Sequence, residues 1–133
     1  MRRSGTAGFT LIEMIVVLAI LALAAGLVLT HGPMRSQRLE LDSAARQVAG
    51  ALRLARSRAI AQERTVAFAL DTRGYSLDRG TPVTWAASVS PAGNRLVVFT
   101  PDGGSSGGLI QLRNGERVVS IGIDWLTGRV VVR

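Results

Sequence analysis

The sequence predicts an α+β fold, in which one long N-terminal helix packs on antiparallel β-sheets. Three observations predict it. A stretch without charged residues covers 14–29, a helical apolar pattern follows, and the second half alternates between apolar and polar residues, with turn signals between the runs. The 133 residues leave room for one small domain beside the apolar stretch. We therefore expect helical segments over 9–30 and 31–64 and a β-rich globular part over 65–133.

The apolar stretch is predicted to cross a membrane. Arg2 and Arg3 precede it, and positive charge ahead of an apolar segment keeps that end in the cytoplasm. A helix from Phe9 to Leu29 would be about 30 Å long, enough to span the hydrocarbon core. A cleaved secretory signal is the alternative, because Ala-Leu-Ala-Ala at 22–25 imitates its small-x-small cut site.

A single acidic residue, Glu13, lies at the start of this segment. A carboxylate inside a membrane span costs about 2.5–3.5 kcal/mol, so its presence suggests a function or a partner. No cation lies within the segment. A free amine at Phe9, four residues earlier on the helix, would neutralise the carboxylate, and that amine exists only if the chain is cut after Gly8.

The residues Gly-Phe-Thr-Leu-Ile-Glu at 8–13, behind a short basic leader, resemble the prepilin peptidase site of the type IV pilin superfamily. The resemblance implies that the leader 1–8 is removed on the cytoplasmic side by cleavage between Gly8 and Phe9. It also implies N-methylation of Phe9. Glu13 would pair with the N-terminal amine of a neighbouring subunit during assembly.

The second helical segment starts at a predicted kink or break, because Gly32 is a weak helix former and Pro33 lacks an N–H group. Its apolar residues recur every three or four positions and predict a helix that covers a core, at Leu41, Ala45, Val48, Leu52, Ala55 and Ala59. A DNA-binding face at Arg53, Arg56 and Arg58 is the weaker alternative, since no DNA-binding motif surrounds them. His31, the only histidine, is interpreted as an interface residue.

After residue 64 the pattern predicts antiparallel strands. A hairpin turn is expected at Asn114-Gly115, because Asn-Gly between alternating runs is a strong hairpin signal. The stretch 82–92 is weakly patterned and is expected to be loop with a short edge strand. The predicted strands cover 65–70, 75–77, 83–85, 95–100, 109–113, 117–123 and 129–132.

Composition and motifs argue against catalysis. Sixteen arginines and nine acids give a net charge of +7, which fits nucleic acid, anionic lipid or an acidic protein partner without choosing between them. Cysteine is absent, the glycine-rich loop 101–108 lacks the lysine of a phosphate-binding loop, and Asp102 alone is too little for a calcium site. We expect no enzyme activity, no cofactor and no metal.

Three segments, 54–60, 99–103 with 107–108, and 124–130, together resemble the GspH family, the minor pseudopilins of the type II secretion system. The resemblance implies a structural subunit near the tip of the periplasmic pseudopilus, which helps to export folded proteins across the outer membrane. The protein would be single-pass in the bacterial inner membrane, with its N-terminus cytoplasmic and its globular part periplasmic. Its partners would be other major and minor pseudopilins, the prepilin peptidase/N-methyltransferase and the inner-membrane secretion platform.

The alternative is a FimT/FimU-like minor pilin of a type IV pilus, which shares the same domain. Some of these pilins bind DNA during uptake through arginines near the C-terminus. Arg129 and Arg133 would then be the DNA contacts, and phosphate contacts by arginine would make binding strongly salt-dependent. For the secretion subunit we do not expect nucleic acid as a partner.

Overall fold

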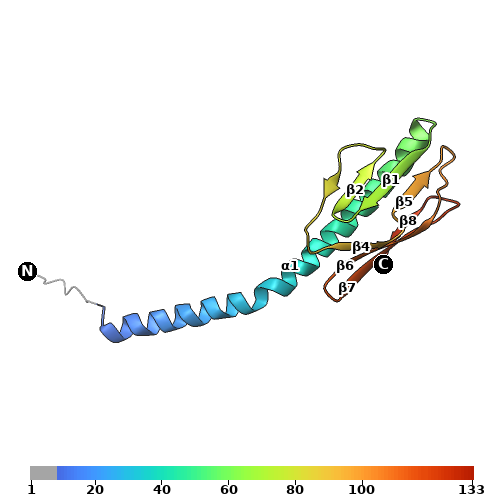
Figure 1. Ribbon diagram of the computed structural model, residues 1–133. Coiled ribbons are helices and arrows are strands. Elements are labelled where there is room, and N and C mark those ends of the chain that lie inside the picture. The colour runs from blue at the N-terminus through green and yellow to red at the C-terminus, as the bar shows by residue number, and fades with distance from the viewer. Residues whose placement is uncertain (1–8) are drawn as a thin grey trace, which may run out of the picture. The chain divides into compact units, whose positions relative to one another are not determined.

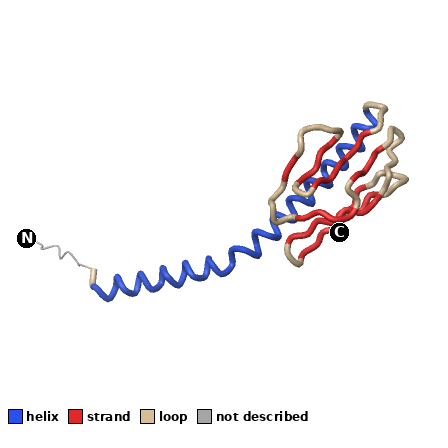
Figure 2. Tube along the Cα trace, in the orientation of Figure 1, coloured by secondary structure: helices blue, strands red, loops and turns tan. Residues whose placement is uncertain are grey.

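The computed structural model describes residues 9–133, except for the side chains at 28–36. The leader 1–8, including Gly8 and its predicted cleavage site, lies outside the described residues. One helix, α1 (Leu11–Ala61), is followed by eight strands in two sheets (Figures 1 and 2). The chain divides into two compact units, Met1–Arg35 and Ser36–Arg133, so the unit boundary lies within α1.

Of the predicted kink or break at 31–33, the break is wrong, because the backbone is helical throughout Leu11–Ala61, and the kink stays a prediction. A proline inside a helix removes one hydrogen bond and distorts the helix, but the turns on either side keep their own bonds. The helix ends shortly before the predicted residue 64. Glu63 adopts a left-handed φ of 49°, and the amides of Glu63 and Arg64 donate to the carbonyls of Ile60 and Ala59. This pairing is a Schellman ending, here without glycine.

All strand pairs are antiparallel and form two four-stranded sheets. Sheet A has the order β3-β2-β1-β5, and sheet B has the order β4-β6-β7-β8. The strands are β1 (Val66–Asp71), β2 (Gly74–Leu77), β3 (Val83–Thr84), β4 (Ser90–Gly93), β5 (Leu96–Phe99), β6 (Gly108–Asn114), β7 (Arg117–Ile123) and β8 (Val130–Val132). The prediction of antiparallel sheets packed on a helix is thus confirmed.

The core lies where the second part of α1 meets both sheets (Figure 1). All six residues of the predicted apolar stripe of α1 are buried, with Leu52 fully so. They pack with inward residues of β1, β5, β6 and β7, the largest being Phe68, Phe99, Ile110, Leu112 and Ile121. The many alanines of the stripe let the helix approach the sheets closely, as small side chains do at packed surfaces.

One strand, β4, was expected to be loop. Its sequence, Ser-Pro-Ala-Gly, has no alternation and low strand propensity. It forms because it is an edge strand that pairs with β6 alone, where Pro91 is tolerated.

The predicted hairpin is confirmed, but its turn is shifted by one residue. Asn114 is still paired with Arg117, so the two turn residues are Gly115 and Glu116, and only Gly115 has a positive φ, of 60°. A glycine at the first turn position is typical of a type II′ turn. Asn114 is 3% exposed, and its amide donates to the Gln37 carbonyl at 3.3 Å. Burying its amide explains why Asn114 ends the strand and does not form the turn.

Candidate functional sites

The first candidate site is the start of α1. Thr10 caps the helix, because its hydroxyl oxygen accepts a hydrogen bond from the Glu13 amide at 3.3 Å. Glu13 lies in the first turn, where a carboxylate is favoured by the positive end of the helix dipole. Phe9 is 76% exposed. The structure therefore places Phe9 and Glu13 on accessible surface, while cleavage, N-methylation and amine pairing stay predictions.

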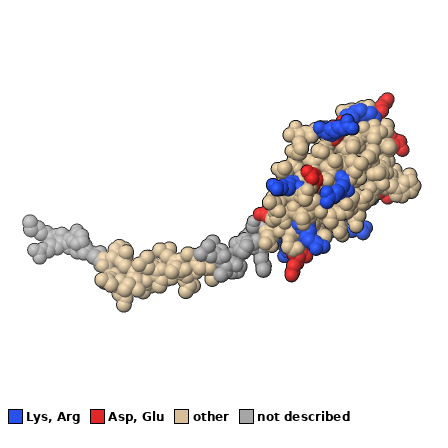
Figure 3. Space-filling view, in the orientation of Figure 1, with Lys and Arg blue, Asp and Glu red and all other residues tan. Residues whose placement is uncertain are grey.

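The first part of α1 exposes large apolar side chains. Within the described residues of the unit Met1–Arg35 they run from Leu11 to Leu27, and the buried core cluster starts only at Leu41. Figure 3 shows no charged side chain on the visible face of this stretch, in which Glu13 is the single charged residue, whereas arginines and acids are spread over the unit Ser36–Arg133. So large an apolar surface is typical of a segment that is covered by a partner or a lipid phase.

Among the residues that the structure describes, no helix combines the length and the mean hydropathy that a membrane crossing requires. The span from Phe9 to Leu29 stays a prediction.

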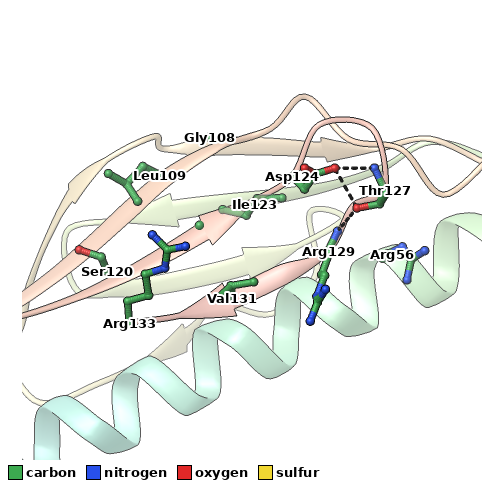
Figure 4. Close-up of a pocket in the computed structure, with 11 residues that line it drawn as sticks. Arg56, Gly108, Leu109, Ser120, Ile123, Asp124, Thr127, Arg129, Val131 and Arg133 are labelled. Carbon is green, nitrogen blue, oxygen red and sulfur yellow. Dashed lines mark hydrogen bonds between the residues drawn. The ribbon is translucent and has the colours of Figure 1, made fainter.

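The second candidate site is a basic hollow on sheet B, of about 710 Å³ (Figure 4). β8 contributes Val131, the residues on either side of this strand contribute Arg129 and Arg133, and α1 contributes Arg56. Gly122 lies on β7, where its missing side chain leaves space beside Val131. Leu109, Ser120, Ile123, Asp124 and Thr127 complete the wall, with Gly108. Arg129 and Arg133, the two predicted DNA contacts, thus line the same hollow. DNA binding by these two residues stays a prediction.

A rigid turn, 124–128, holds one end of this hollow. The Asp124 carboxylate accepts hydrogen bonds from the Leu126 amide at 3.1 Å and from the Thr127 amide and hydroxyl at 2.8 Å (Figure 4). Gly128 closes the turn with a φ of 62°, and its amide donates to the Asp124 carbonyl at 2.9 Å. These bonds fix where Arg129 enters β8.

Arg56 joins the helix to the loops around the hollow. Its Nε donates to the Gly103 carbonyl at 3.1 Å, and its side chain packs beside Gly128. The three segments behind the GspH resemblance, 54–60, 99–103 with 107–108, and 124–130, therefore meet in space at Arg56, Gly103 and Gly128. The sequence alone could not predict this contact, because the three segments are far apart along the chain.

The structure brings together two of the three arginines of the alternative DNA face on α1. Arg53 and Arg56 both line a groove that α1 forms with residues 128–130, and Arg56 is half-buried and bonded to Gly103. Arg58 is exposed and lines neither this groove nor the hollow on sheet B. Asp102, the weak calcium candidate, has its pKa lowered by a hydrogen bond from Thr100. No group of three metal-ligating side chains occurs in the described part of the chain.

We expect the stability of the turn at Asp124 to depend on pH. The bonds from Thr127 hold the pKa of the Asp124 carboxyl below its ordinary value of about 3.9. A lowered pKa stabilises the fold above about pH 3.9, and this contribution is lost as pH falls through the lower folded value. The amide NMR signals of Leu126 and Thr127 should therefore shift with a midpoint below pH 3.9. In Asp124→Asn, which keeps an acceptor oxygen, that step should vanish; its persistence would assign it to another group.

Comparison with known proteins gives two family matches. Residues 3–29 match the prokaryotic N-terminal methylation motif, and residues 44–127 match the family of the type II transport protein GspH. A comparison with curated proteins found no match.

Two crystal structures of the Pseudomonas aeruginosa type IV minor pilin FimU, in space groups P21 and P65, share the fold. The first has 20% identity and a TM-score of 0.62, covering 74% of this chain and 91% of the pilin. The second has 18% identity and a TM-score of 0.57, covering 70% and 92%. This likeness confirms the predicted pilin-like α+β fold. Because the GspH match covers well over half of the 133 residues and the methylation motif precedes it, this chain belongs to the GspH family of the type IV pilin superfamily.

Proposed function

We propose that this protein is a minor pseudopilin of a type II secretion system, located near the tip of the periplasmic pseudopilus. The match of residues 44–127 to the GspH family carries the proposal. As such a subunit it would support the export of folded proteins across the outer membrane. Its role would be structural: the described residues offer a helix for assembly and a β-rich unit for lateral contacts.

The exposed apolar part of α1 supports two successive environments for this helix, first the membrane and then the filament. Before assembly it would sit in the inner membrane, with the N-terminus cytoplasmic and the β-rich unit periplasmic. After removal of 1–8, the new amine of Phe9 would pair with Glu13 of a neighbouring subunit, and the apolar side chains would pack between helices in the filament. The exposure of Leu11, Ile12 and Ile15 in the single chain fits both environments.

The second candidate is a minor pilin of a type IV pilus. It is favoured by one observation, the fold shared with the minor pilin FimU. In that function Arg129 and Arg133 would be the residues offered to DNA, since both line the basic hollow.

A deletion strain separates the two functions. If the chain is a pseudopilin, its loss should leave normally exported proteins in the periplasm and leave surface pili unchanged. Plasmid-borne wild-type protein should restore export. Loss of pili or of DNA uptake with normal export would instead assign the chain to a pilus.

Leader removal provides a separate test. Gly8→Val places a branched side chain at the predicted cut, and we expect the protein to keep its leader. Mass spectrometry of the intact protein should show an unmethylated chain that starts at Met1, whereas wild type should start at methylated Phe9. Ser4→Val, inside the leader but away from the cut, is the matched control and should be processed. Normal processing of Gly8→Val would contradict the predicted site.

A further inference from the structure

β8 lies at one edge of sheet B, and the described part of the chain provides no partner strand for that edge. β8 pairs only with β7, and the ladder includes reciprocal bonds between Arg133 and Ser120 at 2.8 and 2.9 Å. Main-chain groups alternate in an antiparallel ladder, so Val130 and Val132 direct their N–H and C=O groups away from β7. Within the described residues no hydrogen bond reaches these groups. Such a row of unpaired groups is a template for another strand.

The free edge opens into a groove. One wall is the end of the turn before β8 and the first residue of β8, 128–130, and the other wall is the face of α1 that carries Arg53, Arg56, Ser57 and Ile60. The groove has a volume of about 690 Å³, and all its residues belong to the unit Ser36–Arg133. An extended chain therefore finds space beside the start of β8.

The charged side chains around this edge are arginines, apart from Asp124. Arg129 and Arg133 flank β8 at alternate positions with Val131, and all three line the hollow on the sheet face (Figure 4). Arg53 and Arg56 stand on the opposite wall of the groove. None of these four arginines forms an ion pair within the described residues. The one acid that lines the hollow, Asp124, already accepts three hydrogen bonds in its own turn.

We propose that β8 binds an extended acidic segment of another protein chain, which adds to sheet B as an antiparallel strand. In such a pairing, side chains opposite each other share one face of the sheet. The partners of Arg129, Val131 and Arg133 are then residues spaced two apart, so the segment carries the pattern acidic-x-apolar-x-acidic. Main-chain bonds to Val130 and Val132 supply affinity, and the arginines supply register and specificity.

A peptide fits these observations better than a nucleic acid does. Oriented N–H and C=O groups along an edge match another peptide backbone, and phosphates cannot use the carbonyls. Nucleic-acid grooves that take single strands usually add aromatic side chains for stacking. Neither the groove nor the hollow is lined by an aromatic residue in the described part of the chain.

The experiment measures peptide binding to the full chain in detergent micelles, by fluorescence anisotropy. The probe is a labelled peptide, Thr-Glu-Thr-Val-Thr-Glu-Thr, with blocked ends; the comparison peptide has Lys in place of Glu. We expect the Glu peptide to bind at least tenfold more tightly. N-methylation of the two Thr residues that flank Val, which face Val130 and Val132, should abolish binding. N-methylation of the two Glu residues, whose amides point away, should change affinity less than twofold.

Two variants of the protein test edge and charge separately. Val132→Pro removes an outward N–H but no ladder bond to β7, so the fold should persist, as proline does on edge strands. This variant should bind the Glu peptide about fivefold more weakly or worse, which corresponds to the loss of one hydrogen bond. The Val132→Thr variant should bind the peptide with normal affinity. The double variant Arg129→Glu/Arg133→Glu should prefer the Lys peptide. An unchanged thermal midpoint checks that each variant is folded.

Other outcomes overturn the proposal. Peptide binding that ignores both N-methylation patterns and Val132→Pro would show charge attraction without strand addition. Failure of the Glu peptide to bind, together with tight binding of a labelled single-stranded oligonucleotide, would assign the arginines to a polyanion. Neither result bears on the secretion function, which the deletion strain tests separately.

Discussion

Replacing Gly128 by alanine should destabilise the β-rich unit by about 3 kcal/mol. Two effects add. At a φ of 62° a side chain strains the backbone by about 1–2 kcal/mol. The new Cβ would also lie only 2.4 Å from the Gly103 carbonyl oxygen and 2.9 Å from the Arg56 Cδ. The carbonyl is backbone and cannot move alone, so this overpacking costs about a further 1–3 kcal/mol.

The substitution should also disturb the contact between the helix and the loop at Gly103. Arg56 must shift to admit the Cβ, and its bond to the Gly103 carbonyl at 3.1 Å would be lost with it. For a unit of this size 3 kcal/mol corresponds to a fall of roughly 12–24 °C in the midpoint of thermal unfolding. Near-UV and far-UV circular dichroism of the full chain would record it.

Gly122→Ala is the matched control. Gly122 lies on the adjacent strand β7, and a Cβ there would find its nearest atom, the Val131 carbonyl oxygen, at 4.0 Å. We expect a change within about 0.5 kcal/mol, as is usual at unconstrained surface positions. If both variants unfolded at the wild-type midpoint, the close approach of Gly128, Gly103 and Arg56 would be refuted.

The helix of the β-rich unit was predictable in detail, and the reason is periodicity. Leu41, Val48 and Leu52 recur at helical spacing, and burial follows from that spacing. What could not be predicted was where this helix begins. Gly32 and Pro33 are local signals against a helix. The helical hydrogen bonds of the long runs on both sides outweigh them, so the helix continues through these two residues.

The strands likewise divide into those that the sequence pattern predicts and those that depend on tertiary contacts. The paired interior strands β6 and β7 carry alternation and were predicted, whereas β4 contains Pro91 and forms only through its bonds to β6. For the candidate sites, the cleavage motif is local and could be recognised from adjacent residues. The meeting of Arg56, Gly103 and Gly128 depends on tertiary contacts between distant segments, and single-residue patterns do not report them.

Glu13→Val should leave the protein in the membrane and remove it from the filament. In the separate subunit the carboxylate is a cost, about 2.5–3.5 kcal/mol at the centre of a span, so valine should insert at least as well. In the proposed filament the same carboxylate neutralises the amine of Phe9 from a neighbour. Removing one partner of a buried ion pair leaves an uncompensated charge and costs about 3–5 kcal/mol.

These two effects have opposite signs, which makes the variant diagnostic. A cost of 3 kcal/mol or more is a factor of over 100 in an equilibrium, so Glu13→Val should be nearly absent from purified filaments while its membrane level stays normal. Immunoblots of membrane and filament fractions would measure both. Ile12→Val, a neighbouring exposed position, is the matched control and should assemble. Normal assembly of Glu13→Val would leave Glu13 with its role beside Thr10 in the first turn of α1, where the helix dipole alone favours a carboxylate.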